Sequence, residues 1–130
     1  MLMQAGQEQY SVDELPALRV ALREASKDRR LCFLHGRSGR LGVGLGHPTH
    51  AVLTYLATSR PRPVHSVGDR TAGDADIQPP LIFSAFRFAA RCAVPLATAE
   101  AAAEAFFVSG GELPDSVSWE PEPSMSSPEP

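Results

Sequence analysis

Apolar residues recur at helical spacing in the first part of the chain. One stretch is apolar at every third or fourth position, and the resulting face carries Leu15, Leu18, Leu22 and Ala25. This period predicts an amphipathic helix that continues to about Ser26. Ser11 and Glu14 have the spacing of a capping box, with Ser11 as the N-cap. Because proline beyond the first turn removes a backbone hydrogen bond, the regular helix could also begin only at Pro16.

Short apolar runs separated by glycine and proline follow this helix. The predicted strands are Leu31–His35, Leu41–Leu45, Ala51–Ala57, Val64–Val67, Leu81–Phe88 and Ser116–Trp119. Turns at 36–39 and 46–49 join the first three strands. Connections this short join antiparallel strands, because a parallel pair needs a crossover of about a dozen residues or more. The pattern therefore predicts an antiparallel meander.

The second half of the chain adds a loop, a helix and a tail. Residues 68–80 are polar and rich in glycine and proline, which is typical of a flexible loop. Thr98 is placed to cap an alanine-rich helix that ends at Gly110 and Gly111. Residues 121–130 are too polar and proline-rich to fold, so a disordered tail is expected there. We predict one α+β domain over residues 1–120, an antiparallel β-sheet meander packed by an N-terminal and a C-terminal α-helix.

The composition is that of an ordinary globular protein, with 43% hydrophobic and 21% charged residues. It contains no apolar run long enough to cross a bilayer. The segment from Met1 to Gln9 is polar after its first residues and lacks the features of a secretory signal, so we expect a cytoplasmic protein. Cys32 and Cys92 are then expected to be reduced, buried thiols.

The acidic residues are concentrated toward the C-terminus. The net charge is −3, and no Lys or Arg follows Thr98. The acids of this segment are Glu100, Glu104, Glu112, Asp115, Glu120, Glu122 and Glu129. Nucleic acid and membrane are poor partners for such a surface. A basic protein that itself acts on nucleic acid suits it, since complementary fields raise association rates.

Two histidine motifs and three alternating glycines are candidates for a metal site and a phosphate-binding loop. Cys32-x-x-His35 lies on a predicted strand, where residues three apart point to opposite faces, and His47-x-x-His50 straddles a turn, so no metal site or cofactor is expected. Gly42, Gly44 and Gly46 lack the following helix of a phosphate loop. They instead leave one face of a strand bare, which favours close approach by another part of the chain over approach by a partner.

The order of several short motifs resembles a known family. The motif segments are Arg40–Gly46, Ala51–Tyr55, Val64–Asp69, Val94–Leu96, Phe106 to Gly110, and Pro114 to Glu120. Together they resemble the immunity-protein family numbered one of bacterial polymorphic toxin systems, over about residues 12 to 120. The motif residues that the resemblance marks as structural are Gly42, Gly44, Gly46, Ser66, Gly68, Pro95, Phe106, Gly110, Pro114 and Trp119.

The resemblance implies a cytoplasmic, non-catalytic protein that binds a cognate toxin tightly, often a deaminase that attacks cytosine in DNA. The acidic residues nearest the expected core are the candidates for that contact: Asp69, Glu112, Asp115 and Glu120. Trp119 is expected in the core, with an interface anchor as the alternative. Two other functions stay open: a small-molecule-binding or regulatory domain that uses a cavity beside the bare glycine face, and a hydrolase that pairs His65 with Asp69.

Overall fold

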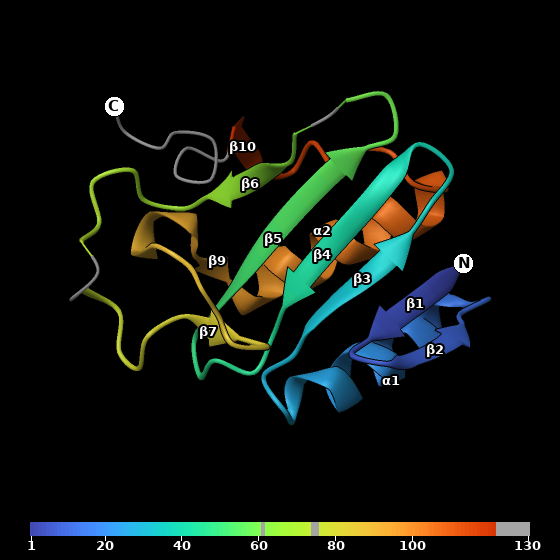
Figure 1. Ribbon diagram of the computed structural model, residues 1–130, viewed down its shortest axis with the longest axis horizontal. Coiled ribbons are helices and arrows are strands. Elements are labelled where there is room, and N and C mark those ends of the chain that lie inside the picture. The colour runs from blue at the N-terminus through green and yellow to red at the C-terminus, as the bar shows by residue number, and fades with distance from the viewer. Residues whose placement is uncertain (61, 74–75, 122–130) are drawn as a thin grey trace.

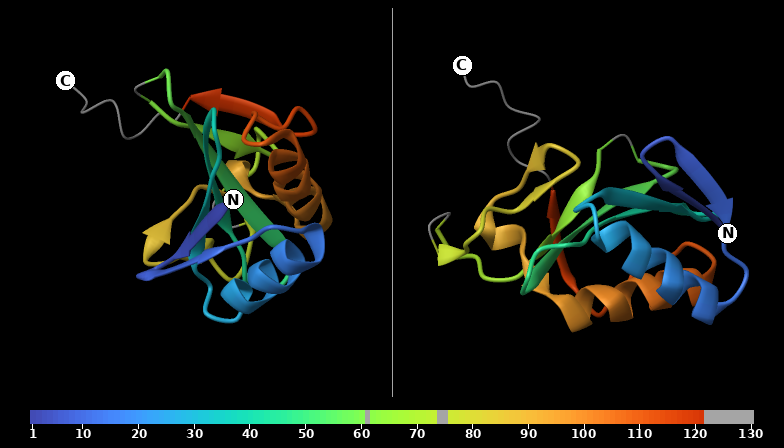
Figure 2. Two further views of the ribbon diagram at one scale, coloured as in Figure 1. Left: turned by 90° about the vertical axis from the view of Figure 1, so that its right-hand side faces the viewer. Right: turned by 90° about the horizontal axis from the view of Figure 1, so that it is seen from below.

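A computed structural model describes residues 1–60, 62–73 and 76–121. Two helices cover one face of a mostly antiparallel sheet (Figure 1), and a short hairpin lies over part of the other face (Figure 2). In chain order the elements are β1 (Leu2–Ala5), β2 (Glu8–Ser11), α1 (Leu15–Ser26), β3 (Leu31–His35), β4 (Gly39–Gly44), β5 (His50–Ala57), β6 (Val64–Val67), β7 (Ile82–Phe83), β8 (Phe86–Arg87), η2 (Ala90–Cys92), β9 (Val94–Pro95), α2 (Leu96–Ser109) and β10 (Ser118–Pro121). The predicted α+β class is confirmed.

The main sheet has the strand order β10-β6-β5-β4-β3-β1-β2, and β9 pairs with β5 beside this path. The pairs β3–β4 and β4–β5 are antiparallel, as the short loops predicted. The next pair, β5–β6, is antiparallel as well. β10 forms one edge of the sheet by pairing with β6, with Trp119 opposite Ser66. The C-terminal segment thus contributes a strand whose partner lies about fifty residues earlier in the sequence.

The larger core lies between the sheet and the two helices. Leu18, Leu22 and Ala25 of α1 are buried in it, which confirms the predicted apolar face. Phe106 of α2 is fully buried and packs edge-on against Tyr55 of β5. Such burial of aromatic and aliphatic surface is the main favourable term in folding.

A smaller core lies on the opposite face of the sheet. Phe83 of β7 is fully buried there with Val52 and Leu81. A Cβ added at Gly44 would lie 2.8 Å from the Phe83 ring, so the bare glycine position is what admits this ring. Gly42 is covered in the same way by Phe33 and Thr54. The expectation that the chain itself approaches this strand closely is confirmed at both glycines.

The helix starts differ from those predicted. α1 begins at Leu15 with Glu14 as its N-cap and no side-chain cap, because Ser11 is already paired with Leu2 in β2. α2 begins at Leu96, two residues before Thr98, with Pro95 as its N-cap. Both predicted caps, at Ser11 and Thr98, are therefore wrong. The predicted ends hold, since α1 stops at Ser26 and Gly110 follows α2 in the left-handed conformation.

Strand boundaries also need correction. Leu81–Phe88 is not one strand but the hairpin β7–β8, whose turn residues Ser84 and Ala85 both have positive φ. A two-residue hairpin turn of this kind ordinarily uses asparagine and glycine. β10 begins at Ser118 and reaches Pro121, the first residue of the expected tail. Residues 122–130 of that tail lie outside the described residues.

The N-terminal hairpin β1–β2 was not expected from the sequence. Met3 and Ala5 of β1 are buried in the larger core, whereas Leu2 is exposed and Gln4 is half-buried. Gly6, with φ of +63°, opens the two-residue turn. The alternation of buried and exposed side chains covers only four residues, which is too short to predict a strand.

Both cysteines are buried and neither forms a disulfide, as predicted. Burial raises the pKa of the Cys32 thiol to about 12. Because this folded pKa lies above that of the unfolded thiol, the stability that the buried thiol contributes is complete below about pH 8.5 and is lost as pH rises toward 12.

We expect Cys32→Ala to show a shallower alkaline loss of unfolding free energy than the unsubstituted chain in urea titrations between pH 8 and 11. Equal slopes would contradict the assigned burial effect.

Candidate partner-binding site

A hollow of about 450 Å³ separates the hairpin β7–β8 from the open face of the sheet. Its apolar walls include Phe33 of β3 and Leu56 of β5 on one side, and Phe86 of β8 and Phe88 on the other. Phe86 is 61% exposed, although it is a large aromatic residue. We call this hollow the hairpin groove.

Arginine side chains provide the charge of the hairpin groove, which Arg40, Arg87 and Arg91 line. The Arg40 guanidinium lies 4.5 Å from the centre of the Phe33 ring, in a cation–π contact. Among the described residues, no carboxylate forms an ion pair with Arg40 or Arg87. The groove therefore combines exposed aromatic surface with two positive charges that no described carboxylate compensates.

Ser66 organises one wall of the groove from beneath. Its fully buried hydroxyl accepts a hydrogen bond from the Leu53 N–H at 3.0 Å and donates one to the Cys92 carbonyl at 2.6 Å. It thereby connects β5 and β6 of the sheet to η2, the segment that carries Arg91. The predicted structural role of Ser66 thus has a specific geometry in this part of the chain.

We expect Ser66→Ala to reduce the free energy of unfolding by about 1 to 3 kcal/mol, because it strands a buried N–H and a buried carbonyl at once. Urea denaturation followed by tryptophan fluorescence measures this loss. Ser116→Ala, at an exposed position, is the matched control and should change little. A loss of the same size at both positions would show that the buried bridge is not the cause.

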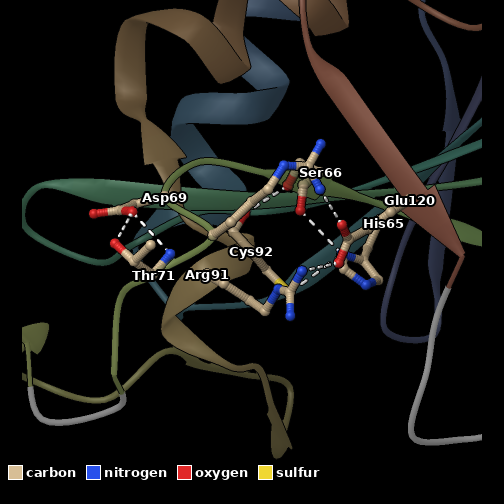
Figure 3. Close-up of polar contacts among 8 residues, drawn as sticks. His65, Ser66, Asp69, Thr71, Arg91, Cys92 and Glu120 are labelled. Carbon is tan, nitrogen blue, oxygen red and sulfur yellow. Dashed lines mark hydrogen bonds and ion pairs between the residues drawn. The ribbon is translucent and has the colours of Figure 1, made fainter.

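His65 lies beside Cys92 in this wall (Figure 3). Its Nδ1 is 3.0 Å from the Ser66 carbonyl oxygen and 3.3 Å from the Cys92 sulfur. A carbonyl can only accept, so the hydrogen bond to Ser66 puts the ring proton on Nδ1. Nε2 is buried and has no hydrogen-bond partner among the described residues.

Glu120 of β10 lies beside His65 (Figure 3). Its two carboxylate oxygens pair with Arg70 and Arg91, and its side chain is only 18% exposed. Glu120 is consequently compensated by two cations inside the chain. The structure gives it a bridging role between β10, η2 and the loop after β6.

Asp69 is placed away from His65, on the far side of Cys92 (Figure 3). Its carboxylate accepts hydrogen bonds from the Thr71 hydroxyl at 2.7 Å and the Thr71 N–H at 2.9 Å. The hydrogen bond from the hydroxyl lowers the pKa of Asp69 most, and the bond from the N–H lowers it further. The acid and base that a hydrolase would need are therefore not brought together.

Glu112 and Asp115 are exposed in the loop between α2 and β10. The Glu112 N–H donates to the Ser109 hydroxyl, which completes the end of α2. No ion pair engages either carboxylate among the residues that the structure describes. The four acids predicted to contact a partner thus divide into two unpaired residues, one in a local turn and one in an internal ion pair.

The remaining motif residues hold elements together. Gly68 donates its N–H to the Arg91 carbonyl, and Pro95 ends β9 where α2 begins. Gly110 carries a carbonyl that accepts from the Arg37 N–H, which joins the end of α2 to the β3–β4 turn.

Pro114 is buried and its carbonyl accepts from the Trp119 indole. Gly46 has φ of +114° and lies against Ser26 and Arg29, so a side chain there would be strained.

No group of three or more His, Cys, Asp or Glu side chains capable of holding a metal ion occurs in residues 1–60, 62–73 and 76–121. His47 shows why its sequence spacing does not make a ligand pair. Its Nε2 faces the Pro79 carbonyl and its Nδ1 accepts the backbone N–H groups of Thr49 and His50. The ring therefore fixes a turn.

The groove itself was not found by sequence reasoning. Phe33, Arg40, Phe86 and Arg87 come from two regions about fifty residues apart, and only the fold brings them together. The one available signal was Phe86-Arg87-Phe88, an aromatic and basic run within a segment predicted to be a strand.

A family model matches most of the chain. The family model described as Immunity protein Imm1 matches residues 9–121, which includes every element from α1 to β10. No curated protein matches the chain. Among the described residues, no helix is long and apolar enough to cross a membrane.

Proposed function

The chain belongs to the Immunity protein Imm1 family, and from this premise we propose that it neutralises a cognate bacterial toxin by binding it in a stoichiometric complex. We further propose that the toxin is a deaminase that acts on nucleic acid. The observation that carries the proposal is the family match over 9–121, which spans nearly the whole described chain. An immunity protein acts by occupying its target.

The arrangement of polar side chains supports inhibition by binding. Asp69 is bonded to Thr71 and His65 to Ser66, so the pair that hydrolysis would require is not assembled. Ser66 and Glu120 are likewise engaged within the chain. These groups hold the scaffold in place, which is what a rigid inhibitor requires.

The charge distribution supports a basic target. Glu112 and Asp115 are exposed and lie in the segment without lysine or arginine. An enzyme that binds nucleic acid needs a positive surface, because neutralising phosphates provides its affinity. We propose that these carboxylates speed the encounter with the toxin, so association should slow as salt rises while dissociation changes little.

The test begins with the reading frame immediately upstream of this chain, where the proposed function places the toxin domain. Cells that express that domain should die or accumulate cytosine-to-uracil changes in DNA, and co-expression of the chain should prevent both. The purified proteins should elute as a one-to-one complex in which deamination of single-stranded DNA is abolished. A chain that leaves the toxin active in the purified system would refute the proposal.

One observation favours a second function. The hairpin groove has the volume and the mixed apolar and polar lining of a small-molecule site. A regulatory domain of this kind would be stabilised by a metabolite alone, through preferential binding to the folded state. A thermal-shift screen without any protein partner tests this alternative.

A further inference from the structure

We propose that the hairpin groove is the surface that holds the toxin, and that its occupant is an acidic segment of the toxin carrying an apolar side chain. This inference rests on the proposed function, because it names the contact by which an immunity protein would hold its target. It differs from the encounter surface at Glu112 and Asp115, which belong to another region of the chain.

The first argument is the exposed apolar surface of the hairpin. Ile82 and Phe86 are both exposed, and they lie on the two short strands of β7–β8. Other exposed apolar residues, such as Val20 and Val108, are single positions on helices. Scattered apolar residues are normal on a protein surface, whereas aromatic ones that border a hollow are typical of binding sites.

The second argument is that the hairpin is fixed in place without its tip being covered. The Ser84 hydroxyl accepts from the Leu31 N–H at 2.7 Å, and the Ser84 N–H donates to the Arg29 carbonyl at 2.9 Å. The hairpin therefore holds Phe86 beside the open sheet face at little further entropic cost. A preorganised aromatic anchor of this type is a common binding hot spot.

The third argument is charge, and it selects the occupant. Arg40 and Arg87 line the groove with no described carboxylate as a partner, whereas Arg91 is already paired with Glu120. A carboxylate from the toxin can pair with either guanidinium, and an apolar side chain beside it can enter between Phe33 and Phe86. Partly buried charge pairs of this kind slow dissociation.

Nucleic acid is the competing occupant, because arginine and aromatic residues also bind unpaired bases. A phosphate backbone repeats its negative charge at every nucleotide, so the net charge of −3 opposes it more than it opposes one short acidic segment. Family membership favours a protein as well. A second copy of this chain is the remaining possibility, and the experiment below distinguishes all three.

The experiment measures, by surface plasmon resonance, the dissociation rate of the purified chain from the cognate toxin domain that the test of the proposed function identifies. Phe86→Ala and the charge reversals Arg40→Glu and Arg87→Glu are each expected to raise that rate about tenfold or more. Matched controls on the helix side are Val108→Ala, at a position 71% exposed, and Arg23→Glu on α1. They should leave the rate within about twofold. Thermal melting confirms that every variant is folded.

A second arm is independent of the toxin. We expect the chain to bind a fluorescent peptide of alternating aspartate and phenylalanine and not the same peptide with lysine in place of aspartate. Arg87→Glu should abolish that binding. If the chain fails to bind the toxin but binds the acidic peptide in this manner, the proposed function fails and the groove's specificity stands.

Four results would overturn the inference. All three groove variants could dissociate from the toxin at the unchanged rate, or toxin binding could be lost only when Glu112 and Asp115 are reversed. The chain could also bind a single-stranded oligonucleotide in preference to the acidic peptide, or it could self-associate in a way that Phe86→Ala removes. The first two leave the proposed function intact, so the two failures can be told apart.

Discussion

Replacing Gly68 by alanine is expected to reduce the free energy of unfolding by about 3 kcal/mol, at the upper end of the cost of overpacking. A Cβ at this position would lie 1.7 Å from the Ala93 carbonyl oxygen. The obstruction is backbone, which cannot rotate away as a side chain can. The same approach allows the Gly68 N–H to donate to the Arg91 carbonyl at 2.8 Å.

The effect should extend to the groove, because Gly68 fixes η2 against the end of β6. Displacing Ala93 would strain the adjacent Cys92 carbonyl, which accepts from Ser66, and would shift Arg91. Gly73→Ala is the matched control in the same loop, where the nearest atom to an added Cβ is 3.8 Å away. Urea denaturation of both variants decides the matter. If Gly68→Ala is within about 0.5 kcal/mol of Gly73→Ala, the close approach is wrong.

The sequence was most informative where a period could be counted. Leu18, Leu22 and Ala25 identified the core face of α1, and the bounds Leu31–His35 and Val64–Val67 are those observed. Short loops fixed the antiparallel order of β3, β4 and β5. These features depend on local spacing, which is fully present in the linear chain.

Elements that depend on tertiary contacts were beyond local patterns. Ser84 and Ala85 adopt positive φ because the turn is anchored to Leu31 and Arg29, and neither residue favours that conformation by itself. β9 has two residues and exists only because it pairs with His50 and Ala51. Such segments carry almost no propensity of their own.

The candidate site could be predicted only in part, for the same reason. Glu120 was predicted to contact a partner, because the arginines that pair with it inside the chain, Arg70 and Arg91, are distant in the sequence. Ser66 and Gly68 were predicted to be structural residues, but which atoms they contact required the fold. The hairpin groove needed both the register of the sheet and the position of β7–β8. Chemistry assembled from distant segments is invisible to spacing rules.

Trp119→Ala is expected to reduce the free energy of unfolding by about 3 kcal/mol, at the lower end for removal of a large aromatic side chain because the indole is only half-buried. The ring packs against the larger core, with its centre 6.3 Å from that of Tyr55. Its Nε1–H donates to the Pro114 carbonyl at 2.7 Å and so closes the loop before β10.

The Trp119 indole therefore links the edge strand to the core, and its role in the core stays a prediction that Trp119→Ala tests. Trp119→Phe keeps most of the apolar contact and loses the hydrogen bond, so a smaller loss of about 1 kcal/mol is expected. Denaturation by urea, followed by far-ultraviolet circular dichroism because the variants lack the only tryptophan, gives both values. Toxin binding measured under conditions where each variant is fully folded should be unchanged. A Trp119→Ala chain that is as stable as the original and no longer binds the toxin would assign Trp119 to the interface instead of the core.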